Sequence, residues 1–318
     1  MKATSFFIIM AFSINTISAF SAEVDQYTLR HLEMKDSSEL LNKKANAALK
    51  IALVNANNKA KGCSEKILYK ELRSYFSNHV QGKLTKDILA DENIVKRYIN
   101  LNESVYQDWT IWDGLGMGSK FLSKKAVTMS GEMRVGNQYV GVDKLEHMWG
   151  QGYSYFEQNY LNEKGEIKAV KTGVAKEKIY LGGNKLGNGV FSYGDLSANF
   201  NGMRFWNHML LKNDDVLGAD MNLGPYIICA NDKWVHAADI DFRNYIDDSM
   251  NESINCSKFP SQHTADKFED RLRIMGTSCP VNVQKRDDMI GKYRQMAKWM
   301  VNKDGVGKVK YTGEFKNK

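Results

Sequence analysis

Proline is scarce in this sequence, with 3 residues among 318. Because proline interrupts helices, its scarcity favours long uninterrupted ones. Long apolar runs are also missing beyond the first 21 residues, which predicts no transmembrane segment in the mature chain. The hydrophobic fraction of 43% nevertheless predicts a packed core and excludes a largely disordered chain.

The familiar catalytic and cofactor-binding motifs are absent. No glycine-rich phosphate loop follows a strand, no C-x-x-C occurs, and neither G-x-S-x-G nor H-E-x-x-H is present. These absences exclude the common nucleotide, zinc-ribbon, serine-hydrolase and zinc-protease patterns, so the sequence assigns no cofactor and no metal. The net charge of +7 is modest and no dense basic cluster with interleaved aromatics precedes the tail, which argues against a nucleic-acid partner.

The first residues have the pattern of a secretory signal peptide. Lys2 supplies a positive charge, residues 6–20 are mostly apolar, and small residues at 19 and 21 favour cleavage before Ala22. The alternative is an uncleaved membrane helix, but serine, asparagine and threonine interrupt the apolar run. We therefore expect an exported protein, periplasmic or secreted, that is soluble or peripheral to the envelope.

Export to an oxidising compartment predicts that the four cysteines form disulfides. Four cysteines allow three pairings, and the sequence alone cannot choose among them. Cys229 and Cys256 flank the segment 234–255, which favours their pairing and leaves Cys63 with Cys279 as a long-range link. The alternative is a set of free buried thiols.

Helical periodicity and changes in composition divide the remaining chain. We expect a mainly α-helical protein with a helical bundle-like core, short β or loop insertions and disulfide links. An aromatic and glycine-rich stretch marks a boundary at Tyr106. The predicted segments are a signal peptide (1–21), an N-terminal helical region (22–105), a main helical domain with the polar site (106–301) and a basic flexible tail (302–318).

Apolar periodicity and turn residues predict the individual elements. The expected N-terminal helices cover 23–58, a stretch from Ser64, and 86–104. The main domain is expected to hold a short hairpin within 135–142 and helices over 143–161, 167–180, 192–211, 239–254 and 286–301. The acidic residues of the 239–254 helix lack the oxygen-rich loop pattern of calcium sites and are interpreted as surface charge; they are Asp247, Asp248 and Glu252.

The first candidate site motif is Asp143-Lys144-x-x-His147. On a helix, Asp143 and His147 share a face, so the carboxylate can orient the imidazole and raise its basicity. A general base or a metal ligand requires that arrangement. The alternatives are structural: Asp143 can cap the helix with Glu146 three residues later, and His147 can be a hydrogen-bonded core residue.

The second motif is Ser192-x-x-Asp195-x-x-x-Asn199-x-x-Gly202, in which the last three residues share a helical face. Ser192 and Asp195 also fit a capping box, while Gly202 allows a close helix crossing. Between the two motifs stands the pair Lys176-Glu177, which by itself reads as a solvated surface pair.

In this order, the motifs resemble the YfiM-like bacterial envelope proteins and, more distantly, the VanZ-like family. Both families carry an Asp-Lys-x-x-His helix followed by an Asp-x-x-x-(Asn/Asp)-x-x-Gly helix, and the YfiM-like proteins also carry the Lys-Glu pair and a Ser-x-x-Asp. The match covers residues 143–202. The resemblance implies a helical core at the cell envelope with these polar residues facing one another. It implies no defined reaction, and this chain lacks the membrane spans of VanZ-like proteins.

Two functional hypotheses follow. In the first, a binding or structural envelope factor holds a buried polar network, drawn from the catalytic candidates Asp143, Lys144, His147 and Asp195 and the ligand-binding candidates Lys176, Glu177, Ser192, Asn199 and Gly202. In the second, a hydrolase acts on envelope lipid or peptidoglycan, with His147 as general base, Asp143 as its orienting acid, and Lys144 or a metal stabilising negative charge. Both require His147 and Asp195 to lie together.

Overall fold

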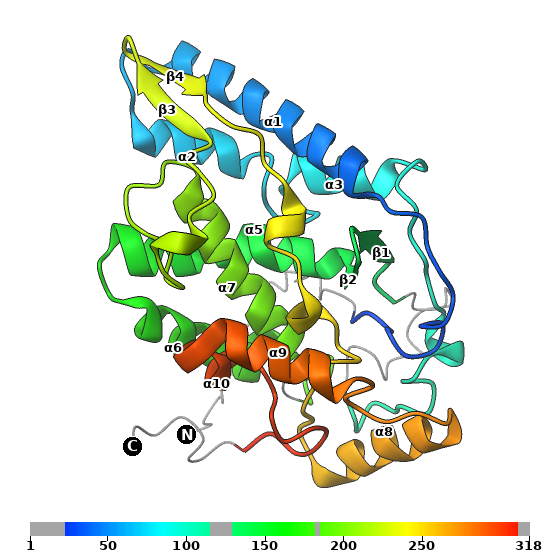
Figure 1. Ribbon diagram of the computed structural model, residues 1–318. Helices are drawn as coiled ribbons and strands as arrows, with labels where there is room; N and C mark the ends of the chain where they lie inside the picture. Colours follow the sequence, from blue (N-terminus) through cyan, green and yellow to red (C-terminus); the bar gives the residue numbers. More distant parts are fainter. Residues whose placement is uncertain (1–22, 115–128, 182–184, 311–318) are drawn as a thin grey trace, which may run out of the picture.

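The computed structural model describes residues 23–114, 129–181 and 185–310. About half of these residues are helical, and two short antiparallel hairpins accompany the helices (Figure 1). The prediction of a mainly helical protein with short β insertions is confirmed at this level. The predicted signal peptide, 1–21, lies outside the described residues. Within them, no helix has the length and hydropathy needed to cross a membrane.

Two crossing helices, α5 (Val142–Phe156) and α7 (Tyr193–His208), occupy the centre of the molecule (Figure 1). They approach closely because glycines meet at the crossing. A Cβ atom on Gly202 would lie 2.0 Å from the Met148 carbonyl oxygen and 2.8 Å from the Cα atom of Gly152. Every residue of α7 is buried, so this helix is the core around which the others pack.

A hairpin leads directly into α5. It consists of β1 (Glu132–Val135) and β2 (Gln138–Gly141), with Met133 opposite Val140. The sequence predicts a hairpin within 135–142, but its first strand begins earlier, at Glu132. The turn is made possible by Gly136, whose φ of 62° is in the left-handed region that glycine tolerates. This short connection fixes where α5 begins.

The N-terminal region contributes α1 (Ser38–Lys59), α2 (Glu65–Arg73) and α3 (Lys83–Ala90). The buried stripe of α1 includes Leu41, Ala45 and Leu49, and these residues belong to the same apolar core as α5 and α7. The N-terminal region and the main region therefore share one core. The second hairpin, β3 (Ile227–Ala230) with β4 (Lys233–His236), packs on α1.

Three predicted helices are wrong in extent. The helical stretch expected over 23–58 begins only at Ser38, because residues 23–37 form turns and isolated bridges. The helix expected over 86–104 ends at Ala90, because the Asp91 carboxylate accepts the backbone N–H of Asn93 and starts a turn. The last helix, expected over 286–301, divides into α9 (Val283–Tyr293) and α10 (Ala297–Met300). The break falls at Arg294, whose φ is 49°.

The helix expected over 239–254 is wrong altogether. This segment forms two 3-10 turns, Phe242–Asn244 and Asp248–Met250, joined by irregular chain. At each turn an aspartate captures a backbone N–H: Asp241 accepts from Arg243, and Asp247 accepts from Ser249. Such local bonds compete with helix formation. The same irregular backbone carries Glu252 into the interior.

The interpretation of the acidic residues of this segment as surface charge is also wrong. Asp247, Asp248 and Glu252 are all buried. Asp247 accepts hydrogen bonds from Lys292 and Tyr293 of α9, at 2.5 and 2.6 Å. Burial alone would raise the pKa of Asp247, but the Lys292 ammonium and these hydrogen bonds hold it below its usual value. The segment is therefore held to α9 by ionic contacts.

All four cysteines form disulfides, but the favoured pairing is wrong. Cys63 pairs with Cys229, with Cα atoms 6.0 Å apart, and Cys256 pairs with Cys279, at 5.7 Å. The first bond forms because the β3–β4 hairpin packs beside the α1–α2 connection. The second forms because the segment after Glu252 lies against the turn that follows α8 (Gln262–Ile274).

Part of the predicted flexible tail is folded onto the protein. Asn302 is 2% exposed and donates to the carbonyl oxygen of Cys256 at 2.6 Å. Phe259 pairs through its backbone with Gly307 and Val309, at 2.9 and 2.8 Å. Residues 302–309 therefore belong to the packed structure, and 311–318 lie outside the described residues.

Candidate functional site

A lysine side chain with no solvent exposure stands at the centre of the candidate site. Lys144 Nζ lies 2.6 Å from Asp143 Oδ2, 2.7 Å from Asp195 Oδ1 and 2.7 Å from Glu252 Oε1. These residues come from α5, from α7 and from the irregular segment after the second 3-10 turn. We call the four residues the carboxylate–lysine cluster. Gly194 makes room for it, because a Cβ atom there would lie 3.0 Å from Lys144 Cε.

The three carboxylates keep Lys144 charged. Burial lowers the pKa of a lysine, but here Asp143, Asp195 and Glu252 outweigh that effect and raise the pKa well above its usual value. An ammonium group has three N–H donors, and three carboxylates lie at contact distance. The lysine is therefore a fully paired internal counter-ion.

His147 extends the cluster toward the protein surface. Its Nε2 atom lies 3.2 Å from Asp195 Oδ2, and its Nδ1 atom lies 3.2 Å from Asn199 Oδ1. The expected proximity of His147 and Asp195 is confirmed. The expected orienting acid is wrong, because Asp143 contacts Lys144 while Asp195 orients the imidazole. Both ring nitrogens therefore face side-chain oxygens, which fix the orientation of the imidazole.

The pKa of Asp195 reflects these contacts. Burial would raise it, but the positive charges of His147 and Lys144 hold it below its usual value. Asp195 therefore bridges Lys144 and His147, one on each of its oxygens.

The capping interpretation holds for one motif only. Ser192 caps α7, since its Oγ atom accepts the backbone N–H of Asp195 at 3.1 Å, and it also donates to Glu252 Oε1 at 2.8 Å. Ser192 therefore both caps α7 and belongs to the site. Asp143 does not cap α5, whose N-cap is Gly141 without a side-chain cap bond.

The Lys176-Glu177 pair is divided between two environments. Lys176 Nζ lies 3.4 Å from Ser154 Oγ, on the outer side of α5, and is not among the contacts of the cluster. Glu177 has no solvent exposure, at the end of α6 (Glu166–Lys176) where the helix passes into a π turn (Glu177–Leu181). Burial, and then the charge of Asp195, raise the pKa of Glu177 well above its usual value.

Two buried acidic residues, Glu252 and Glu23, lie outside the sequence motifs. Glu252 is in direct contact with Lys144, and Glu23 is buried, with its Oε1 atom 3.4 Å from Asn188 Nδ2. Burial, then the charges of Glu252 and Asp195, raise the pKa of Glu23 well above its usual value. The alternation of asparagine and serine around Glu252 could have indicated a turn, since Asn251 accepts the backbone N–H of Ser253.

The cluster has the composition of a cation site. Asp143, Asp195 and Glu252 each offer an oxygen, and these oxygens lie within 4.8 Å of one another. Carboxylate oxygens are the ligands that hard divalent cations prefer. In the present structure the Lys144 ammonium is in contact with all three carboxylates and neutralises part of their charge.

A second buried network lies at the other end of α7. Asp215 accepts from Arg204 Nε at 2.8 Å and lies 3.0 Å from His208 Nε2, while His208 Nδ1 lies 2.7 Å from the Tyr245 hydroxyl. The side chains of Arg204, His208 and Asp215 have no exposure. Burial would raise the pKa of Asp215, but His208 and Arg204 lower it. This arrangement fixes α7 against the following segment.

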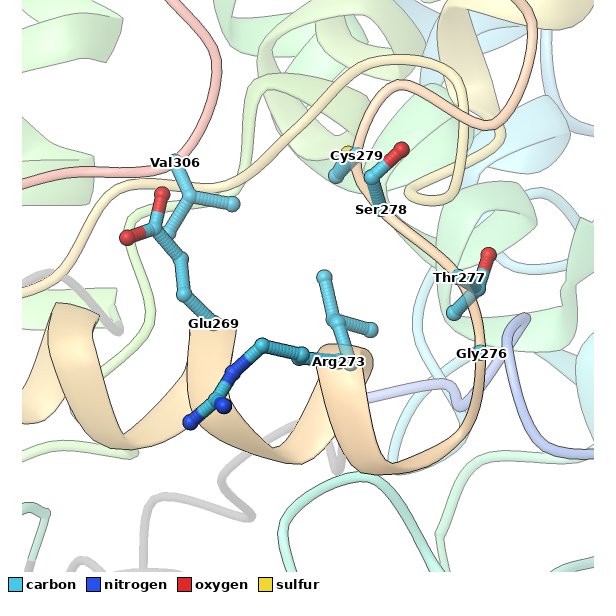
Figure 2. Close-up of a pocket in the computed structure, with 8 residues that line it drawn as sticks. Glu269, Arg273, Gly276, Thr277, Ser278, Cys279 and Val306 are labelled. Atoms are coloured by element: carbon cyan, nitrogen blue, oxygen red, sulfur yellow. The ribbon is translucent and has the colours of Figure 1, made fainter.

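Four surface pockets among the described residues lie away from the polar site. One pocket, of about 530 Å³, lies beside α8. Figure 2 shows Ser278 and Cys279 on one side of it and Val306 and Glu269 on the other. Three more pockets of about 320 to 570 Å³ are lined by other segments. None of these four contains a cluster residue in its lining. The cluster is enclosed, with side-chain exposures of 8% for His147 and 7% for Asp195.

No protein-family model, curated protein or solved structure matches this chain. The resemblance to the YfiM-like and VanZ-like proteins therefore depends on the motifs alone.

Proposed function

We propose that this protein is an exported cell-envelope factor with a binding or structural role, in which the carboxylate–lysine cluster holds separate segments of the chain together. The observation that carries the proposal is Lys144, which has no exposure and pairs with carboxylates from α5, α7 and the segment around Glu252. The two disulfides fit an oxidising compartment. An envelope lipid or peptidoglycan component is the partner class we propose.

The contacts of His147 support this role over catalysis. A general base needs a ring nitrogen with a free lone pair near its substrate. In His147 both ring nitrogens face oxygen acceptors, at 3.2 Å each. The enclosed position of the ring further favours a network that orders the interior.

A hydrolase is the second candidate, and one observation favours it. The pKa of Asp195 is lowered while the pKa of nearby Glu177 is raised, and such divergence is typical of acid–base pairs. In this role Asp195, rather than Asp143, would orient His147. A ring nitrogen would first have to leave its acceptor before it could activate water.

Replacement of Lys144 tests the structural role. Lys144→Ala leaves three buried carboxylates without their counter-ion, and we expect a loss of about 3–5 kcal/mol in the free energy of unfolding by denaturant titration. The matched control is Lys44→Ala. Lys44 also pairs with two carboxylates at 2.8 Å, but its side chain is 18% exposed, so we expect a loss below about 1 kcal/mol. Equal losses in the two variants would contradict the proposal.

A parallel assay addresses the hydrolase. The exported protein is incubated with labelled peptidoglycan and with phospholipid vesicles, and released products are compared with those of His147→Ala. The proposal predicts no release above that of the variant. Turnover that disappears in His147→Ala would establish the second candidate instead.

A further inference from the structure

Lysines gather on the outward side of α6. The side chains that this helix buries include Ala169, Val170 and Val174. Lys168 and Lys171 are three residues apart and project from the opposite side, where Lys168 is exposed and Lys171 is half-buried. The helix therefore presents a basic side away from the core.

Two other segments bring lysines to the same place. The Lys171 ammonium lies 5.6 Å from the centre of the Trp299 ring, and the Lys298 ammonium of α10 lies 5.4 Å from the same centre. Figure 1 shows α6 and α10 close together. Just after α6, the Lys178 ammonium donates to the backbone carbonyl oxygen of Lys310 at 3.1 Å. Lysines from three segments therefore lie on one face.

The charge of several of these lysines is available to an external anion. Within residues 23–114, 129–181 and 185–310, Lys164, Lys168 and Lys298 form no salt bridge with a carboxylate, and all three are exposed. The neighbouring acidic residues, Glu163 and Glu166, stand at the start of the helix, where its dipole favours negative charge. The lysines outnumber them, so the face is positively charged.

Aliphatic side chains are exposed beside these lysines. Ile167 is 41% exposed and lies one helical turn before Lys171. Leu161 is 46% exposed and ends a π turn (Glu157–Leu161) that packs against α6. Lysines interspersed with exposed apolar side chains are typical of helices that lie in the interface of a lipid bilayer.

We propose that this surface docks the protein on an anionic phospholipid bilayer, with the lysines at the lipid phosphates and the two aliphatic side chains in the interfacial layer. The surface, which we call the basic face, consists of Leu161, Lys164, Ile167, Lys168, Lys171, Lys298 and Lys310. The inference rests on the proposed function and deepens it, because it names the lipid as the envelope partner.

Charge complementarity favours this partner. The whole chain carries a net charge of +7, and lysines close to a bilayer are attracted by anionic lipids. A peptidoglycan strand fits less well, because sugars and peptides are held by hydrogen bonds that Ile167 and Leu161 cannot supply.

Co-sedimentation with vesicles tests the inference. The full exported chain, with its disulfides intact, is mixed with vesicles of phosphatidylcholine alone or with vesicles that also contain about 30% phosphatidylglycerol. We expect binding to the anionic vesicles and at least about tenfold weaker binding to the neutral ones. Raising the salt to about 0.5 M should weaken the binding to anionic vesicles, because salt screens exposed charges.

Variants of the basic face should lose this binding. Replacing Lys164, Lys168 and Lys298 together by glutamine should weaken binding to the anionic vesicles at least about tenfold. Ile167→Ser should weaken it at least about threefold, because less apolar surface enters the interface. Substitutions at exposed positions of this kind seldom affect folding, and near-ultraviolet circular dichroism confirms that each variant is folded.

The matched control replaces Lys61, Lys66 and Lys70 together by glutamine. These lysines are also exposed, but they lie at α2 and just before it, and α2 is well separated from α6 in Figure 1. The control changes the net charge by the same amount and should leave the affinity within about twofold.

Equal binding to the two kinds of vesicle, or equal losses in the two triple variants, would overturn the inference. Unchanged affinity in Ile167→Ser would do the same, and so would binding to isolated peptidoglycan in place of vesicles. The Lys144→Ala unfolding measurement is made without lipid. A large loss there together with absent vesicle binding overturns the docking surface alone and leaves the proposed structural role standing.

Discussion

Lys144 and Glu252 are 108 residues apart in the sequence, yet the lysine Nζ atom lies 2.7 Å from Glu252 Oε1. The contact joins the start of α5 to a segment without regular helix or strand structure. Glu252 is held from the other side as well, because its backbone N–H donates to Gln26 Oε1 at 2.8 Å. The N-terminal segment, α5 and the irregular segment thus meet at one residue.

The helix crossing beneath this contact gives the first prediction. In Gly202→Ala, the new methyl group would lie 2.0 Å from the Met148 carbonyl oxygen, so the helices must separate. We expect a loss of about 3 kcal/mol or more in the free energy of unfolding. Gly150→Ala on the same pair of helices is the control. Its Cβ atom meets nothing within 4 Å, and the better helix propensity of alanine should stabilise the protein by about 0.5–1 kcal/mol. A similar result for both variants would contradict the observed crossing.

The two disulfides should differ in their effect on stability. The Cys63–Cys229 bond spans 166 residues and the Cys256–Cys279 bond spans 23. Chain-entropy arguments give about 5 kcal/mol for the first and about 3 kcal/mol for the second. Paired alanine variants compared by denaturant titration measure this difference. Peptide mapping without reduction should recover Cys63 joined to Cys229, and recovery of Cys63 joined to Cys279 would refute the structure at this point.

The pH dependence of stability should change in Glu177→Gln. The pKa of Glu177 is raised above the unfolded value of 4.5, so its contribution to stability is present below that value and is lost as the pH rises toward the folded pKa. One such group changes the free energy of unfolding by about 1.4 kcal/mol per pH unit within this window. In chelator, the wild-type protein should therefore lose more stability between pH 5 and about pH 7 than the variant. Parallel curves for the two proteins would show that this carboxyl group is not the cause.

His147→Ala separates a structural from a catalytic histidine. Loss of the imidazole removes its contacts with Asp195 and Asn199 in an enclosed site. We expect a loss of about 2 kcal/mol, which lowers the melting temperature by roughly 4 °C in a protein of this size. Calorimetry measures the melting temperature of the variant and of the wild-type protein. An unchanged melting temperature would favour the catalytic alternative.

The helical half of the site could be predicted from the sequence because it depends on local periodicity. Asp143 and His147 lie one turn apart, as do Asp195 and Asn199, and residues at that spacing share a face whatever the surroundings. Gly202 indicated the crossing because a residue without a side chain allows two helices to approach closely. Which carboxylate would face His147 could not be deduced, since that depends on the rotation of α5 relative to α7.

The remaining half of the site depends on tertiary contacts that leave no periodic signal. Glu252 stood in a segment with apparent helical spacing, but Asp241 and Asp247 captured backbone donors and prevented that helix. Glu23 follows the predicted cleavage site, and nothing in its neighbours indicates burial. The disulfide pairing failed for a related reason, because the position of the β3–β4 hairpin on α1 is set by packing.

A double-mutant cycle between Lys144 and Glu252 tests the central claim most directly. The free energy of unfolding is measured for Lys144→Met, for Glu252→Leu and for the double variant. Because each single change strands a buried charge or carboxyl group, the account predicts a loss for the double variant smaller than the sum of the single losses by about 2 kcal/mol or more. Additive losses, within about 0.5 kcal/mol, would show that the two groups do not interact and would contradict the account.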